Sequence, residues 1–102
     1  MRMNTLSSIL KFIGSRFETI QGGYVAAQTV AGNSYTDIPV TFQKKYSSPP
    51  AVVACVSSGS TDGAIGSIAV SVNGPTETGF TLRVFNAGSS TRQPGIRWIA
   101  IP

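Results

Sequence analysis

Few side chains in this sequence could perform acid–base or nucleophilic chemistry. The 102 residues include four carboxylates, one cysteine and no histidine. Without histidine, the usual serine and cysteine triads and histidine metal sites are excluded. Outside the first twenty-two residues, only Asp37, Asp62 and Glu77 could supply the carboxylate pair that glycoside hydrolysis requires. We therefore predict that the protein is not an enzyme; a glycan depolymerase that pairs Asp62 with Glu77 across subunits is the alternative that stays open.

The single cysteine offers no further chemistry. Cys55 has no second cysteine with which to form an intrachain disulfide, and one chain cannot assemble a zinc site. It lies in the apolar run 51–56, where we expect a small buried hydrophobic residue. The sequence predicts neither a metal site nor another cofactor.

Two polar segments contain side chains suited to a hydroxyl-rich ligand. Hydroxyl, amide, carboxylate and guanidinium groups can form several hydrogen bonds with neighbouring sugar hydroxyls. Segments 57–63 and 86–94 are expected to be loops, and binding residues are often found on loops held by a rigid scaffold. The candidate ligand-binding residues are Ser60, Asp62, Asn86, Ser90, Arg92 and Gln93. The same residue types are common in solvated turns, so that interpretation also stays open.

The two arginines near the end of the chain also have a structural interpretation. Arg83 and Arg97 should lie near each other, on strand faces that point away from the core. There they would pair with Asp37 or Glu77 across a contact between subunits, because a buried charge without a partner is costly. A role in ligand binding is the alternative. Trp98 alternates in register with apolar neighbours, so we expect it in the core.

The overall composition excludes several classes of protein. Eight lysine and arginine residues against four acids give a net charge of +4, and charged residues are 12% of the chain. Hydrophobic residues reach 41%, which argues against intrinsic disorder. No apolar run approaches the roughly 20 residues of a membrane-spanning helix. Lys44 and Lys45 are the only adjacent basic pair, too few for a nucleic-acid-binding surface.

The pattern divides the chain into an amphipathic helix over residues 1–22 and a head domain over 23–102. Apolar residues of the first segment recur at alternating spacings of three and four, the heptad pattern of a coiled coil. These residues are Met3, Leu6, Leu10, Ile13, Phe17 and Ile20. Gly22 stands where a glycine often ends a helix. So short a helix is only marginally stable on its own. It must therefore pack on the head domain of its own chain, on a membrane surface or against copies of itself. Of these three interpretations, we predict an oligomerising stalk.

After residue 23, short runs of alternating apolar residues are separated by turn-forming segments. The expected strands cover residues 24–31, 35–42, 52–57, 64–72, 80–86 and 96–101. The polar segment 44–50 contains two prolines, which prevent ladder pairing there. Six strands without an intervening helix predict an all-β fold, a six-stranded antiparallel β-sandwich.

These strands have more apolar residues than one sandwich can bury. Val53, Phe85, Ile99 and Ile101 fall on the strand faces opposite those that face the core. Because large exposed apolar patches usually mark association surfaces, we predict a homo-oligomer. Its interface would combine the heptad stripe with Phe85, Ile99 and Ile101, and the residue types of the stripe permit a trimer.

Three stretches of the head form a recognisable set: VTFQKKYSSPPAVVACV, VNGPTETGFTLRVFNAG and GIRWIAI. In order and spacing they resemble the H-type lectin domain found at the tips of phage tail fibres. The resemblance spans residues 24–102. It implies a six-stranded antiparallel sandwich that assembles as a homotrimer, in a family that includes sugar-binding lectins and the host-recognition domains of tail fibres.

The resemblance also implies a function, namely a receptor-binding head of a phage tail fibre that recognises bacterial surface carbohydrate. The implied partners are copies of itself and a glycan, with no nucleic acid and no membrane insertion. Animal members surround N-acetylgalactosamine with acidic, arginine and aromatic or histidine side chains; this chain has no histidine, so that specificity does not transfer. A structural fibre knob or decoration protein without a ligand is the alternative.

The implied location is the virion, after synthesis in the bacterial cytoplasm. Lys11, Gly14 and Arg16 interrupt the apolar stretch near the amino terminus. A signal peptide requires a continuous apolar region followed by a small-residue cleavage site, so we predict that none is present.

Overall fold

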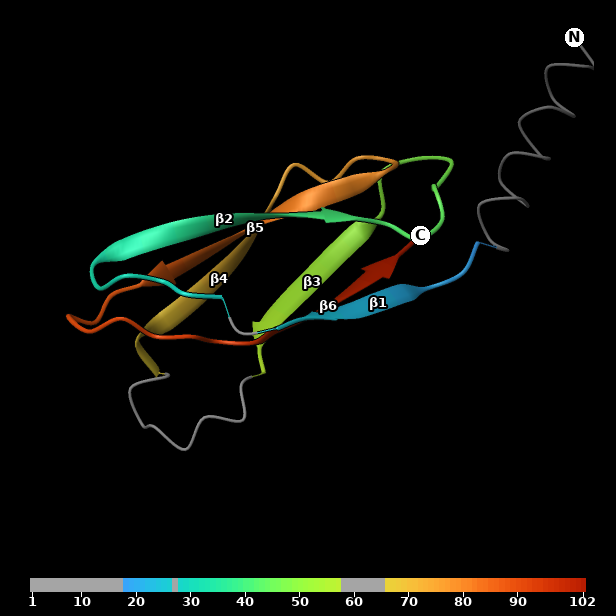
Figure 1. The fold of residues 1–102 in the computed structure, drawn as a ribbon. Helices are drawn as coiled ribbons and strands as arrows, with labels where there is room; N and C mark the ends of the chain where they lie inside the picture. The colour runs from blue at the N-terminus through green and yellow to red at the C-terminus, as the bar shows by residue number, and fades with distance from the viewer. Residues whose placement is uncertain (1–17, 27, 58–65) are drawn as a thin grey trace, which may run out of the picture.

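The computed structural model describes residues 18–26, 28–57 and 66–102. In this part of the chain, six strands form two three-stranded antiparallel sheets, in the orders β1-β6-β3 and β2-β5-β4 (Figure 1). The strands are β1 (Gln21–Val25), β2 (Ser34–Thr41), β3 (Ala51–Val56), β4 (Ile68–Asn73), β5 (Gly79–Asn86) and β6 (Ile96–Ile101). The prediction of an all-β fold built from six antiparallel strands is confirmed.

The core lies between the two sheets, because alternate residues of each strand point inward. In β5, Leu82 is fully buried whereas its neighbour Arg83 is exposed. Phe42, Phe80 and Trp98 form an aromatic cluster in this core, with ring centroids between 5.2 and 5.8 Å apart. Trp98 therefore packs against the core, as its register predicted.

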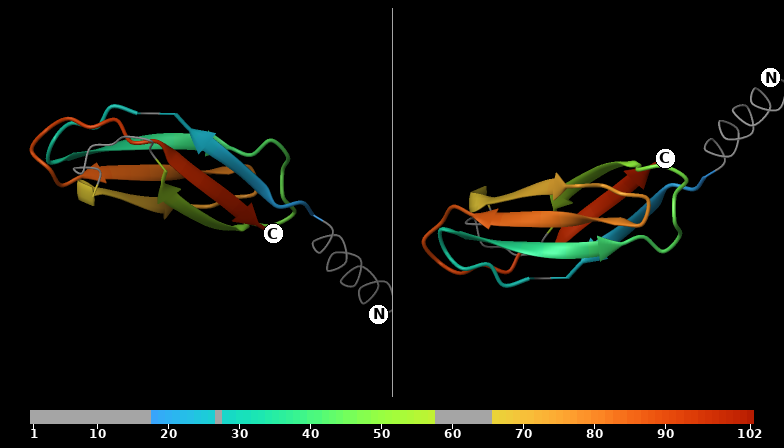
Figure 2. Two further views of the ribbon diagram at one scale, coloured as in Figure 1. Left: turned by 90° about the horizontal axis from the view of Figure 1, so that it is seen from below. Right: turned by 90° about the horizontal axis from the view of Figure 1, so that it is seen from above.

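The two stacked sheets form a sandwich with two long sides, each made by one edge strand from either sheet. β3 and β4 contact each other along one side of the sandwich, whereas β1 and β2 lie along the other side (Figure 2). Each sheet therefore presents an outer face to its surroundings, and the loops gather at the two ends.

The first strand differs from the expectation. β1 begins at Gln21, so Gly22 lies inside a strand, and the prediction that it ends a helix is wrong. Pairing with β6 places Gly23 opposite Trp98, and a Cβ at Gly23 would lie 2.8 Å from Nε1 of the indole. Glycine is needed here because the tryptophan packs against the strand. β1 also ends at Val25, so residues 28–33 form a loop instead of extending the strand.

Most of the predicted stalk lies outside the described residues. This applies to Met3, Leu6, Leu10, Ile13 and Phe17. Ile20 is described; it is 56% exposed and has no regular secondary structure. The coiled coil thus stays a prediction. No helix in the described part of the chain is long and apolar enough to cross a membrane.

Cys55 is exposed, so the expectation of a buried cysteine is wrong. Val52, Ala54 and Val56 pack toward the core from β3. Strand alternation then places Cys55 on the outer face. Its partner in the β6 register is Arg97, so the thiol shares the outer surface with a charged residue.

Candidate functional site

The loops 28–33 and 87–95, which we call the distal loops, form the end of the sandwich opposite the one where the chain enters β1 (Figure 1). Main-chain hydrogen bonds join them. The amide of Asn33 donates to the carbonyl of Gly88 over 2.8 Å, and Val30 and Arg92 exchange two bonds of 2.8 and 3.0 Å. The distal loops are therefore one structural unit.

Asn86, the last residue of β5, holds the distal loops in place. Its side chain is fully buried. Its Nδ2 donates to the carbonyls of Val30 and Ser90, over 3.1 and 2.8 Å. Its Oδ1 accepts from the amide of Gly88 and the hydroxyl of Ser67, over 2.9 and 3.1 Å. Four protein groups use the whole bonding capacity of the carboxamide, so Asn86 supports the loops from below; its role as a ligand-binding residue stays a prediction.

Three other candidate residues lie together on the second distal loop. Ser90 and Gln93 are exposed, and Arg92 is half-buried. The side-chain amide of Gln93 donates to Oγ1 of Thr29 over 3.3 Å, which adds a side-chain link between the two loops. This surface therefore offers a hydroxyl, a guanidinium and an amide above the buried Asn86.

A tight turn brings the distal loops close to each other. A Cβ at Gly32 would overlap the main-chain carbonyl of Ser89. Asn33 follows with a φ of 53°, in the left-handed region that asparagine tolerates better than most residues. Glycine at 32 and asparagine at 33 thus allow the close approach that the loops require.

The remaining candidates, Ser60 and Asp62, lie outside the described residues. The pairing of Asp62 with Glu77 across subunits is therefore untested and stays a prediction. Glu77 forms an ion pair with Lys45 at 3.5 Å. The described part of the chain contains no group of three or more side chains that could hold a metal ion.

Arg83 and Arg97 lie on different sheets, so the expectation that they are neighbours is wrong. Arg83, on β5, donates from Nε and Nη2 to the two carboxylate oxygens of Asp37, over 2.8 and 2.9 Å. Its guanidinium carbon also lies 4.2 Å from the ring centroid of Tyr35. Asp37 is one of the two partners predicted for Arg83, but the pair forms within one chain.

Arg97 has a similar environment on the other outer face. Its guanidinium carbon lies 4.8 Å from the ring centroid of Tyr24, and its Nε donates to Oγ of Ser57 over 3.0 Å. Each outer face thus contains an arginine stacked on a tyrosine, and both arginines are ordered by contacts within the chain.

The Asp37–Arg83 pair should make stability depend on pH in the acid range. Hydrogen bonds from Arg83 hold the pKa of Asp37 below its ordinary value of 3.8. A lowered carboxyl pKa stabilises the fold above the unfolded-state pKa, and the contribution is lost as pH falls through the folded-state value. The urea midpoint of Asp37→Asn should therefore lie below that of the natural protein at about pH 6, and the difference should shrink below about pH 4. A difference that does not change with pH would contradict this role.

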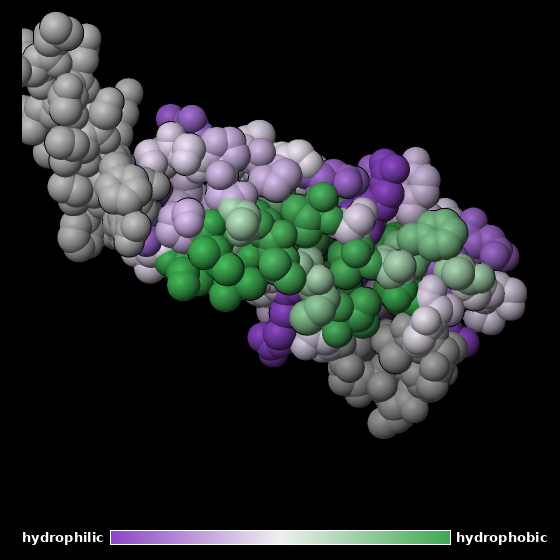
Figure 3. Space-filling model, turned by 180° about the vertical axis from the view of Figure 1, so that it is seen from behind, coloured by the Kyte–Doolittle hydropathy of each residue, from purple (hydrophilic) through white to green (hydrophobic). Residues whose placement is uncertain are grey.

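The apolar residues predicted for the interface are exposed on two opposite outer faces. Ile99 and Ile101 are about two-fifths exposed on β6, at 41% and 42%, and the pairing partner of Ile99 in β3 is Val53, at 59%. Phe85 is 42% exposed on β5, on the other sheet. From the side of β3 and β4, hydrophobic side chains form a continuous band along the molecule (Figure 3). Of the predicted interface residues, Phe85 and the pair Ile99 and Ile101 therefore lie on different sheets.

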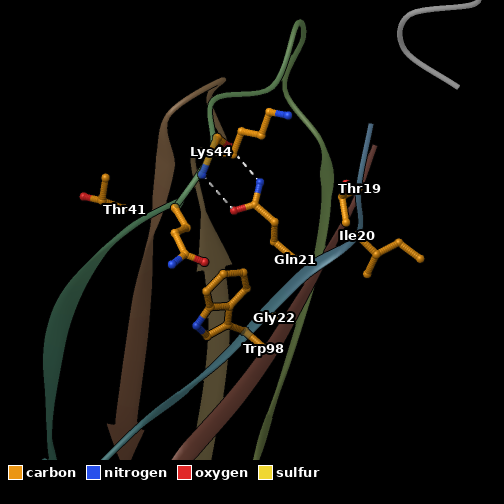
Figure 4. A pocket seen from close by; sticks show the side chains of 8 residues that line it. Thr19, Ile20, Gln21, Gly22, Thr41, Lys44 and Trp98 are labelled. Atoms are coloured by element: carbon orange, nitrogen blue, oxygen red, sulfur yellow. Dashed lines mark hydrogen bonds between the residues drawn. The ribbon is translucent and has the colours of Figure 1, made fainter. Parts of the chain in front are cut away.

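A pocket of about 560 Å³, the Trp98 pocket (Figure 4), lies where β1 begins and β2 ends, at the opposite end of the sandwich from the distal loops (Figure 1). It is lined by Thr19, Ile20, Gln21, Gly22, Thr41, Gln43, Lys44 and Trp98. Gln21 fixes one wall, because its Nε2 donates to the carbonyl of Lys44 over 2.7 Å and its Oε1 accepts from the amide of Lys44 over 3.1 Å.

The sequence analysis missed this pocket, because its lining residues come from three separate segments. The pair Gly22-Gly23 is the one signal that could have found it, but the sequence analysis interpreted Gly22 as a helix end. Two glycines in an edge strand can indicate that a bulky side chain packs closely against the backbone, and here that side chain is Trp98.

Comparison with known proteins establishes the family. The H-type lectin domain matches residues 37–101, which is more than half of the chain. The protein therefore belongs to the H-type lectin domain family, as the sequence resemblance indicated. Among curated proteins, none matches the chain in sequence.

Solved structures with the same fold are tail fibres and tailspikes. An N-truncated R1-type pyocin tail fibre aligns at 21% identity and a TM-score of 0.69, over 81% of this chain and 69% of that chain. A longer part of the R1 pyocin fibre of P. aeruginosa gives 21% and 0.70, over 81% and 22%. The tailspike protein gp49 of Pseudomonas phage LKA1 gives 27% and 0.66, over 80% and 14%. The chain thus spans less than a quarter of the two longer proteins.

Proposed function

We propose that the protein is the receptor-binding head of a phage tail fibre, a component of the virion that binds bacterial surface carbohydrate without enzymatic activity. The observation that best supports this proposal is the position of the distal loops. In a fold that tail fibres share, they present polar side chains at the end farthest from the entry of the chain into the sandwich (Figure 1). A fibre tip would meet a cell surface with this end.

The chemistry of the distal loops suits a hydroxyl-rich ligand. The hydroxyl of Ser90, the guanidinium of Arg92 and the amide of Gln93 offer several donors and two acceptors within one loop. The buried Asn86 fixes that loop before any ligand arrives, which reduces the entropy lost on binding. Ser60 and Asp62, which lie outside the described residues, stay predicted ligand-binding residues.

We further propose that the head is a homotrimer. Phe85 and the pair Ile99 and Ile101 lie on opposite outer faces. A twofold contact uses one patch on both copies, whereas a head-to-tail ring buries one face of each copy against the other face of the next. A closed ring therefore covers both apolar faces with a single kind of contact, and a three-stranded stalk would share its symmetry axis.

Trimerisation would also set the strength of binding. Three weak carbohydrate sites held at fixed separation bind a surface more tightly than one site, by about 10²- to 10⁴-fold, without any new contact. A protein with such sites should bind glycan-coated surfaces far better than the same glycan free in solution.

A structural fibre knob without a ligand is the second candidate. It is favoured by one observation, namely that Asn86 and Gln93 are engaged in hydrogen bonds within the protein. Adsorption competition separates the two candidates, because a receptor-binding head added in excess should block phage adsorption to its host, whereas a structural knob should not.

A glycan array with the intact protein tests the proposed function directly. We expect binding to at least one capsular or cell-wall glycan. Ser90→Trp should reduce this binding by at least about tenfold, because a bulky ring at an exposed loop position blocks the surface without disturbing the core. Ser48→Trp, at an exposed position in the segment 44–50, is the matched control and should bind normally. Binding that Ser90→Trp does not weaken would place the receptor site elsewhere.

A further inference from the structure

We propose that the Trp98 pocket is a second carbohydrate site, selective for saccharides that bear a negative charge. It lies at the other end of the sandwich from the distal loops (Figure 1). Its existence does not depend on glycan binding by those loops. The argument combines an aromatic wall, unused polar groups and one cation.

The indole of Trp98 provides the aromatic wall. Phe42 and Phe80 pack against it from the core, with ring centroids 5.8 and 5.2 Å away. The ring is nevertheless only half-buried, and its remaining surface borders the pocket. Because a tightly packed aromatic ring keeps one orientation, it is a ready-made platform for the C–H face of a sugar ring.

Polar groups surround this platform. Thr41 and Gln43 are both lining residues, although the side chain of Thr41 points away from Trp98 (Figure 4). Among the described residues, neither side chain has a hydrogen-bonding partner. The side-chain amide of Gln21, by contrast, forms two hydrogen bonds with the main chain of Lys44 (Figure 4). These bonds hold this wall of the pocket in place. A volume of about 560 Å³ falls within the range of small-molecule sites, and this lining fits a ligand with many hydroxyls.

Lys44 gives the pocket its charge preference. Of the lining residues, it is the charged one. The neighbouring Lys45 pairs with Glu77 at 3.5 Å, and the carboxylate of Glu18 accepts a hydrogen bond of 3.0 Å from the amide of Ser47. Within the described part of the chain, no carboxylate neutralises Lys44. A carboxylate or phosphate on the sugar would do so.

The intrinsic fluorescence of the intact protein tests this proposal, because Trp98 is the only tryptophan in the chain. The probes are tetragalacturonic acid and the neutral tetrasaccharide cellotetraose. We expect a saturable change in emission with the acidic probe, and at least about threefold weaker binding of the neutral one. Lys44→Gln should weaken binding of the acidic probe about threefold to fivefold, and Gln43→Ala about threefold or more.

Lys45→Gln is the matched control, since it removes an adjacent charge that is already paired, and it should leave the emission titration unchanged. A lack of any saturable change in the natural protein would overturn the proposal, and so would equal effects of Lys44→Gln and Lys45→Gln. Either result would leave the distal loops untested, because Trp98 reports on this pocket alone and Ser90→Trp tests the loops separately.

Discussion

Replacing Ile99 by aspartate is expected to dissociate the protein into monomers. Ile99 lies within the outer face of the β1-β6-β3 sheet, with Gly22 and Val53 as its cross-strand neighbours. In an assembly that buries this face, the new carboxylate is taken out of water, at a cost of about 3–5 kcal/mol for each unpaired charge. Light scattering should show a mass that falls to the 10.7 kDa of one chain.

Phe85→Asp tests how the copies meet. In a head-to-tail ring every contact joins two different faces, so Phe85→Asp should dissociate the assembly as fully as Ile99→Asp does. An assembly through one self-complementary face would respond to only one of the two substitutions. Ser48→Asp adds the same charge in the exposed segment 44–50, and should leave the mass unchanged. An oligomer that survives both Ile99→Asp and Phe85→Asp would contradict the proposed interface.

Replacing Asn86 by alanine is expected to reduce the free energy of unfolding by about 2–4 kcal/mol. The substitution removes all four side-chain hydrogen bonds and leaves the carbonyl of Val30 and the amide of Gly88 without this partner. Urea denaturation at one fixed protein concentration measures the effect, because dissociation makes the midpoint depend on concentration. The distal loops should loosen at the same time, so glycan binding should weaken as well.

Two further variants separate the hydrogen bonds of Asn86 from its shape. Asn86→Asp keeps the acceptor that faces Gly88 but places an oxygen against the carbonyls of Val30 and Ser90. It should destabilise the fold at least as much as alanine at neutral pH. Gln93→Ala, which removes one exposed bond, should change stability by less than about 0.5 kcal/mol. A loss below about 1 kcal/mol for Asn86→Ala would show that Asn86 does not hold the loops.

Most of the sandwich could be predicted because its strands alternate strictly. The sequence of β5 places Leu82 inward and Arg83 outward, and β6 has the predicted bounds Ile96–Ile101. The exposure of Phe85 and Ile99 follows from the same alternation. A period of two residues is a local property of the chain, so it can be recognised without knowing which strands pair.

The errors arose where a residue's role depends on a distant partner. Gly22 fits a helix end in sequence, but it belongs to a strand paired with β6, some seventy-seven positions later at Ile99. Asn86 has the composition of a loop residue, yet the approach of Val30 and Ser90 turns it into a buried support. The prediction that Arg83 and Arg97 are neighbours failed because sequence does not reveal which strands share a sheet.

The candidate site could be predicted only in part. Ser90, Arg92 and Gln93 lie on a surface loop, as the run of polar and turn-forming residues indicated. The Trp98 pocket was not predicted, because its three segments come together only through tertiary packing. In addition, the sequence analysis placed Trp98 in the core, with no surface left for a ligand. An aromatic residue can serve both roles when only part of its ring is covered.

The mass of the full 102-residue chain in solution tests the central claim, that copies of this protein cover each other's outer apolar faces. Multi-angle light scattering should give a mass of about 32 kDa, three times the 10.7 kDa of one chain. The value should stay constant as the protein is diluted through the micromolar range. A mass of 10.7 kDa at all concentrations would contradict the claim, because Ile99, Ile101 and Phe85 would then face water in the native protein.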